Sequence, residues 1–309
     1  MRRGGWEARA AAEARGGIGP RGDEPCGQDG RSAAMATRIH TPARGTLNAA
    51  SIAVLLAAAF QILTPLMPQL GVGEPIGRQS DTVRTLITPA GWAFSIWGLL
   101  YLGSTLFAIY QLLPAERDNP LLARIRWPAA GAFLGNGVWA AYTQVFGLSA
   151  ISSAIIILTL ACLVAIYRVF GSGQAGSGQA GSGQFGSRQF GSGRLSTGER
   201  WLAFVPLSAL TAWLTVATTV NIAASLRFHG VEGGAATPMI AAAVVVVAGV
   251  IAATALIRER GNLPYALVFL WALAAIFAAG GQEATLVAGA TAVAAVLVVV
   301  GLVTGMRRG

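Results

Sequence analysis

Long apolar runs separated by short polar segments make up most of the chain after its first 45 residues. The runs approach or reach the roughly 20 residues that a helix needs to cross about 30 Å of hydrocarbon. This pattern predicts an all-α integral membrane protein with about eight transmembrane helices. The predicted spans lie at about 46–67, 88–113, 127–146, 149–170, 201–226, 237–257, 264–280 and 284–305.

Composition and charge agree with a membrane location. Hydrophobic residues make up 54% of the chain and charged residues only 11%, whereas about 25% of a soluble domain is charged. A net charge of +9 would point to nucleic acid in a soluble protein, but here membrane topology accounts for it and we expect no nucleic-acid partner.

The basic residues also predict an orientation. All 22 are Arg, and with both termini cytoplasmic only three fall in the outside loops, namely Arg78, Arg84 and Arg227. The positive-inside rule therefore predicts a multi-pass protein of the plasma (inner) membrane with both termini in the cytoplasm.

Two segments differ from the spans in composition. Residues 1–45 are rich in Arg, Gly and Ala and are expected to be a disordered tail, in which Met35 is a candidate for the natural start. Residues 171–199 hold a Gly/Ser/Gln repeat, whose composition predicts a flexible linker between the fourth and fifth spans.

Several aromatic residues lie deep within the predicted spans. Trp usually sits at the edge of a bilayer, because its N–H needs a hydrogen-bond partner. Indoles near mid-span therefore predict a bundle with an aromatic-lined interior. These deep aromatic residues are Trp97, Tyr101, Trp139, Trp213 and Trp271. Asn136 precedes Trp139 by three residues and Asn221 follows Trp213 by eight, so each amide is expected near a ring.

These residues resemble motifs of the TspO/translocator-protein family, the tryptophan-rich sensory proteins. The second predicted span carries Pro89, Gly91, Trp92 and Phe94, followed by Trp97, Leu100 and Tyr101. The third has Asn136 and Trp139, and the fifth has Pro206, Trp213, Ala217 and Asn221. The resemblance covers residues 46–226 and implies a five-helix membrane domain. Residues 227–309 then hold three additional spans, as in an enlarged, divergent member of the family.

The resemblance implies a membrane receptor or sensor that binds a flat apolar molecule, such as a tetrapyrrole or a sterol-like lipid. The implied ligand-binding residues are Trp97, Tyr101, Trp139 and Trp213 as stacking walls, with Asn136 and Asn221 orienting polar edges. Packing alone also accounts for the rings, and a hydrogen bond between helices also accounts for each Asn. Expected partners are membrane lipid, the hydrophobic ligand and, as a further candidate, a second copy of the chain in a homodimer.

The remaining chemistry argues against an enzyme. No HExxH, GxSxG or P-loop motif is present, and no His/Cys spacing suits a metal site. We therefore expect no catalytic residue, no metal and no cofactor other than a porphyrin-type ligand. The acidic residues lie outside the spans or at their edges, which weakens a proton-coupled transporter. A permease for a small hydrophobic molecule and a structural subunit of a membrane complex remain as alternatives.

Overall fold

The structure is a computed structural model, and it describes residues 48–175 and 195–308. The predicted tail and most of the predicted linker lie outside the described residues. The described residues all belong to one compact unit. Within the described ranges the regular structure is entirely helical, as predicted.

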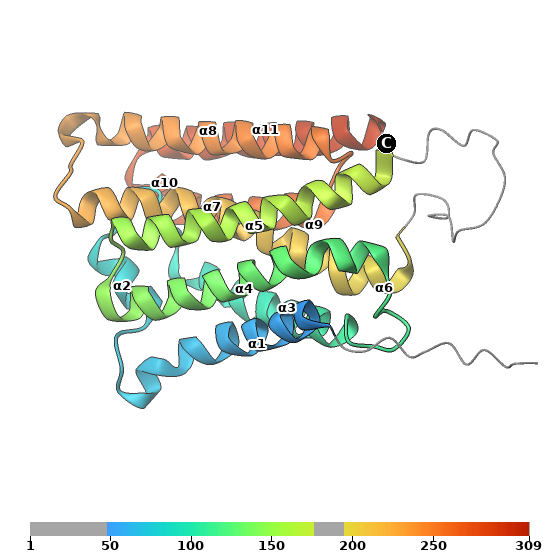
Figure 1. The fold of residues 1–309 in the computed structure, drawn as a ribbon. Coiled ribbons are helices and arrows are strands. Elements are labelled where there is room, and N and C mark those ends of the chain that lie inside the picture. Colours follow the sequence, from blue (N-terminus) through green and yellow to red (C-terminus); the bar gives the residue numbers. More distant parts are fainter. Residues whose placement is uncertain (1–47, 176–194, 309) are drawn as a thin grey trace, which may run out of the picture. The chain divides into compact units, whose positions relative to one another are not determined.

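Eight long helices in the described part of the chain run back and forth past one another (Figure 1). They are α1 (Ala49–Leu63), α3 (Ile96–Tyr110), α4 (Pro120–Phe146), α5 (Ala150–Ala175), α7 (Val205–Phe228), α8 (Thr237–Arg258), α9 (Leu263–Ala278) and α11 (Thr285–Arg308). Shorter elements extend or connect them: η1 (Thr64–Leu70), α2 (Ile76–Thr82), η2 (Gly91–Ser95), α6 (Thr197–Glu199), η4 (Arg200–Phe204), η5 (Gly234–Ala236) and α10 (Gly280–Glu283).

Seven of the long helices, counted over the described residues and with their short extensions, are long and apolar enough to cross a membrane. The exception is α4, which carries Arg124, Arg126, Asn136 and Gln144 along its length. The protein is therefore an all-α, multi-pass membrane protein, as its sequence predicts.

Capping residues explain where several helices begin. The Asn119 side chain accepts hydrogen bonds from the first turn of α4, and Pro120 occupies the first helical position. Ser196 and Glu199 form a capping box at the start of α6. Asn262 caps α9, so this helix begins at Leu263, one residue before the predicted start.

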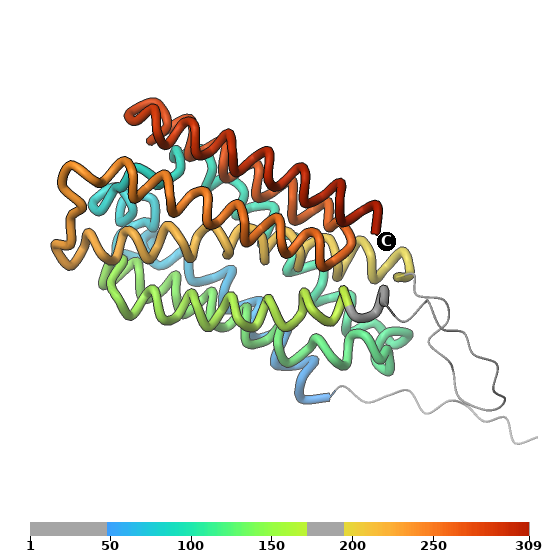
Figure 2. The backbone as a smooth tube through the Cα atoms, turned by 90° about the horizontal axis from the view of Figure 1, so that it is seen from above, coloured from blue at the N-terminus to red at the C-terminus, as the bar shows by residue number. Residues whose placement is uncertain are grey.

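Five of the described helices form a closed ring, which we call the helix ring. Going round it, α1 packs against α4, α4 against α5, α5 against α7, α7 against α3, and α3 against α1. The last helices lie beside this ring: α9 packs on α7, and α11 packs on both α8 and α9 (Figure 2). In the described part of the chain, three further long helices thus lie on the α7 side of the helix ring.

Arg126 does not lie in a loop, as the predicted span beginning at residue 127 implied. Because α4 begins at Pro120, Arg126 is inside the helix and only 1% exposed. Its guanidinium donates to Gln111 Oε1 at 3.1 Å and to the main-chain oxygens of Gln111, Glu116 and Arg117 at 3.3, 2.9 and 2.9 Å. Arg126 therefore satisfies carbonyl groups at and beyond the end of α3, which explains its burial.

Small residues allow α4 and α5 to pack closely. A Cβ added to Gly131 would lie 3.0 Å from Cys162 Sγ, and one added to Gly135 would overlap Thr159 Oγ1 and lie 3.5 Å from Thr159 Cα. The GxxxG pair formed by these glycines is thus a helix–helix contact.

Replacing Gly135 by Val is expected to destabilise the protein by about 1–3 kcal/mol, because the added carbons overlap α5. Unfolding in mixed detergent micelles measures this loss. Gly289→Ala is the matched control, since an added Cβ there meets no described atom within 4 Å; it should be neutral or slightly stabilising. An equal loss of stability in Gly135→Val and Gly289→Ala would contradict the close contact between α4 and α5.

Candidate functional site

Four of the aromatic residues predicted from the sequence come together inside the helix ring. Trp97 stacks on Tyr101 with ring centroids 5.2 Å apart and on Trp139 at 6.4 Å. It also meets Trp213 edge to face at 6.1 Å, and Phe94 meets the same indole at 6.2 Å. We call Phe94, Trp97, Tyr101, Trp139 and Trp213 the aromatic cluster. Its members come from η2, α3, α4 and α7, and therefore from three sides of the ring.

The spacing of residues on α3 and α7 explains why Trp97 meets Trp213. Gly103 of α3 packs directly on Pro206 of α7, where an added Cβ would lie 2.6 Å from Pro206 Cβ. The two helices run in opposite directions (Figure 1). Trp97 lies six residues before Gly103 and Trp213 seven after Pro206, or about 9 and 10 Å along each axis. The close contact therefore brings the two indoles level with each other.

An amide pair borders the aromatic cluster on the α1 side. Asn136 Nδ2 donates to Gln61 Oε1 at 3.2 Å, and the Tyr101 side chain faces Asn136. Gly137 allows the close approach of α1, because an added Cβ there would lie 3.1 Å from Gln61 Cα. The sequence interpretation missed Gln61, although an amide in the apolar stretch that follows Ser51 was an available signal.

Four polar atoms around the cluster find no hydrogen-bond partner within the described residues: Trp139 Nε1, Trp213 Nε1, Gln61 Nε2 and Asn136 Oδ1. The residues that carry them are buried, with exposed fractions of 5%, 3%, 0% and 1% in that order. Buried polar atoms are nearly always paired, so each such atom calls for an explanation. Together with the rings, these four polar atoms define the candidate site.

Two other residues that the sequence placed in the interior have different surroundings: Asn221 is buried, with its Nδ2 unpartnered among the described residues, and Trp271 is at the surface. Asn221 joins α7 to α5, accepting hydrogen bonds from Ser152 Oγ at 3.0 Å and Ser153 Oγ at 2.9 Å. Eight helical residues separate it from Trp213, which is about 12 Å along the axis and about 80° around it. Trp271 was expected in the interior but is 39% exposed; it packs edge to face on Trp92 at 4.7 Å.

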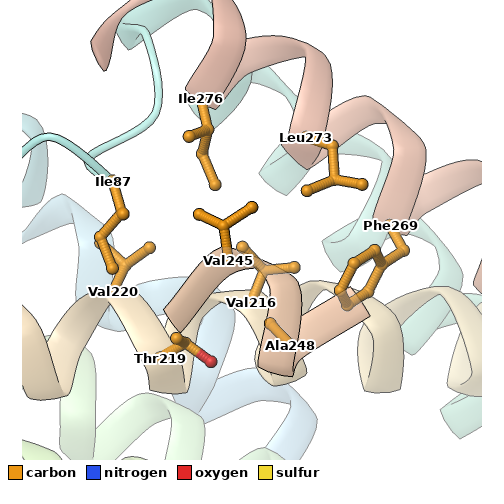
Figure 3. A pocket seen from close by; sticks show the side chains of 9 residues that line it. All are labelled: Ile87, Val216, Thr219, Val220, Val245, Ala248, Phe269, Leu273 and Ile276. Atoms are coloured by element: carbon orange, nitrogen blue, oxygen red, sulfur yellow. The ribbon is translucent and has the colours of Figure 1, made fainter. Parts of the chain in front are cut away.

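A small apolar cavity lies outside the aromatic cluster, between α7, α8, α9 and the segment before η2 (Figure 3). Figure 3 shows Val245, Phe269, Leu273 and Ile276 around it, with Ile87 closing one side. Its volume of about 10 Å³ suits one water-sized sphere, whereas sites for drug-sized ligands have about 300–1,000 Å³. The cavity is therefore too small for a flat ligand.

Glu259 lies just beyond the end of α8, outside the candidate span Gly234–Arg258. Burial raises the pKa of its carboxyl from 4.5 to about 7, against an opposing attraction from Arg168. Its carboxylate packs over Gly171 of α5, where a side chain would collide with it. Glu259 therefore changes charge near neutral pH at a contact between α8 and α5.

Because the pKa of Glu259 is raised on folding, its contribution to stability is fully present below pH 4.5 and is lost as the pH rises to about 7. Glu259→Gln should remove this slope and stabilise the protein at pH 8 by about 1 kcal/mol, a small figure because the group is partly exposed. Unfolding measured from pH 4 to 8 tests this. Glu232, which is exposed, provides the control Glu232→Gln; an unchanged slope in Glu259→Gln would contradict the assignment.

Among the described residues no group of three His, Cys, Asp or Glu side chains is placed to hold a metal ion. Comparison with known proteins gives one family match. A family model described as TSPO-like protein matches residues 47–304. No curated protein and no solved structure matches the chain.

Proposed function

We propose that this chain, which belongs to the TSPO-like protein family, is a membrane receptor or sensor that binds a flat, mostly apolar molecule within the helix ring. The family match includes the last three helices, beyond the 46–226 region on which the sequence resemblance rested. The ligand classes that we expect are tetrapyrroles and sterol-like lipids.

One observation carries this proposal: Trp97, Tyr101, Trp139 and Trp213 turn their rings toward one another inside the helix ring. Stacking on such ring faces supplies affinity for a flat apolar molecule, and a few polar groups supply its orientation. Asn136 and Gln61 are placed to orient the ligand. Asn221 Oδ1 accepts hydrogen bonds from Ser152 and Ser153 of α5, while its Nδ2 has no partner among the described residues, so its role in orienting a ligand stays a prediction.

Binding in this site requires the rings to move apart. The centroids of Trp97 and Trp139 are 6.4 Å apart and their planes are 25° from parallel. A flat molecule inserted between them would replace one ring–ring contact by two ring–ligand contacts. Trp97 and Tyr101 are partly exposed, so the α3 side is the more accessible part of the cluster.

We further propose an inner-membrane location with both termini cytoplasmic. In Figure 1 the beginning of α1 and the end of α11 lie at the same end of the helix bundle, which supports placing both termini on one side of the membrane. The Arg excess of the segments assigned to the cytoplasm supports the choice of side. At the other end, Arg78 pairs with Glu74 at 2.6 Å and Arg84 with Asp81 at 3.7 Å, so each of these two Arg has an acidic partner.

Titrating the purified protein with the uncharged dimethyl ester of protoporphyrin IX while following tryptophan fluorescence tests the proposed function. Saturable quenching at one site per chain is expected, because the indoles of the cluster would contact the ligand. Uptake of a labelled apolar substrate into vesicles without such quenching would favour a permease. Absence of both quenching and uptake would overturn the receptor and favour a structural subunit.

A further inference from the structure

Most of the four polar atoms of the candidate site are hydrogen-bond donors. Trp139 Nε1, Trp213 Nε1 and Gln61 Nε2 are hydrogen-bond donors, and only Asn136 Oδ1 is an acceptor. All belong to residues that are at least nine-tenths buried, and within the described chain they are left without a partner. A ligand that satisfies this set must offer mainly acceptor atoms.

The absence of charged side chains from the site limits the class of ligand further. The aromatic cluster, Gln61 and Asn136 include no carboxylate, ammonium or guanidinium group among their side chains. The nearby buried cation, Arg126, lies ten residues before Asn136, about 15 Å along α4, and its guanidinium donates to oxygens at the end of α3. A carboxylate on the ligand would lose its water without gaining a counter-ion, which is strongly unfavourable.

We infer that the site selects an uncharged apolar molecule bearing carbonyl or ether oxygens, and that Gln61 is a specificity-determining residue for those oxygens. This inference rests on the proposed function and defines the ligand class for the same site. The indole N–H groups and the Gln61 amide donate to the oxygens, while the rings contact the apolar body. Molecules of the same shape that carry carboxylates are discriminated against.

The geometry around Gln61 explains why this residue is singled out. Its oxygen is held by Asn136 Nδ2 at 3.2 Å, which fixes the amide and leaves Nε2 as its free end. Gly137 allows α1 and α4 to pack closely at this level, and the Gln61 side chain is fully buried. An amide held in this way donates to a ligand at little further cost in side-chain entropy.

Two matched probe pairs test the inference on the full chain in detergent micelles. The first is protoporphyrin IX and its uncharged dimethyl ester, and the second is androstanedione and the parent hydrocarbon androstane. Wild type should bind the diketone about tenfold more tightly than androstane, which is the effect of one or two hydrogen bonds, and the diester at least about tenfold more tightly than the acid, whose carboxylates would be desolvated without a counter-ion. For each pair, the ratio of the two affinities is compared between wild type and variant. This comparison cancels differences in how the two probes partition into the micelle.

Gln61→Leu should reduce the diketone-to-hydrocarbon ratio about tenfold and leave androstane affinity unchanged. Gln61→Asn, which keeps the amide on a shorter stem, should restore part of the ratio. Equal binding of the porphyrin acid and its ester, or an unchanged ratio in Gln61→Leu, would overturn this inference while leaving the receptor intact. Binding of none of the four probes would overturn the proposed function itself.

Discussion

Replacing Arg126 by Leu is expected to lower the free energy of unfolding by about 3–5 kcal/mol, the largest loss of stability that we predict for a single side chain. The guanidinium holds oxygens of Gln111, Glu116 and Arg117 in a region where it is itself 1% exposed. Leucine fills much of the space but donates no hydrogen bond. The carbonyl groups would then remain buried and unpaired, which costs about 1–3 kcal/mol for each.

Gln111 extends the same network to α1, because its Nε2 donates to Ser51 O at 3.0 Å. Loss of Arg126 should therefore loosen α1, α3 and α4 together. Unfolding in mixed micelles measures the effect, with Arg124→Leu as the control, since Arg124 is on the same helix and exposed. If both variants unfolded at the same detergent composition, the network would not contribute to stability.

Replacing Trp97 by Ala is expected to weaken ligand binding about 10- to 100-fold, the largest functional effect that we predict. Trp97 is the ring that contacts Tyr101, Trp139 and Trp213, so its removal takes away a stacking wall and leaves the other rings unsupported. A factor of 10–100 corresponds to about 1.4–2.8 kcal/mol, in line with the loss of an aromatic contact and its buried area.

Trp127→Ala is the matched control for this change. Trp127 is an indole of α4 but is 62% exposed and lies outside the aromatic cluster. Its removal should leave the affinity within about twofold of wild type. Affinity is measured from the absorbance of the bound porphyrin ester, so that the missing indole does not alter the readout. Similar affinities for the two variants would show that ligand does not use the cluster.

The all-α class and seven of the eight long helices of the described residues follow from apolar length, which reports a membrane span. The start of α4 was harder to predict, since Arg124 and Arg126 look like loop residues until their partners are known. Arg126 is tolerated in the helix only because the end of α3 supplies carbonyl groups to it. A sequence does not show which distant oxygens meet a buried cation.

The candidate site was predictable in part for a similar reason. Trp97, Trp139 and Trp213 were identified from depth and motif, and the structure brings them together. Trp271 lies at a similar depth, but α9 is apolar on all sides, so periodicity does not distinguish its inner face from its lipid-facing side. Asn221 shares a slowly drifting strip of the helix surface with Trp213; over eight residues the drift reaches about 80°, and Asn221 Oδ1 accepts from Ser152 and Ser153 of α5, which the sequence does not show.

Quenching by brominated lipids most directly tests the central claim that the aromatic cluster faces the interior of the helix ring and receives a ligand there. A variant in which Trp6, Trp92, Trp127, Trp201 and Trp271 are replaced by Phe keeps only Trp97, Trp139 and Trp213. In vesicles of brominated phospholipid its emission should be largely protected, and the porphyrin ester should then quench it saturably. Strong quenching by the brominated acyl chains with no further response to the porphyrin ester would contradict the claim.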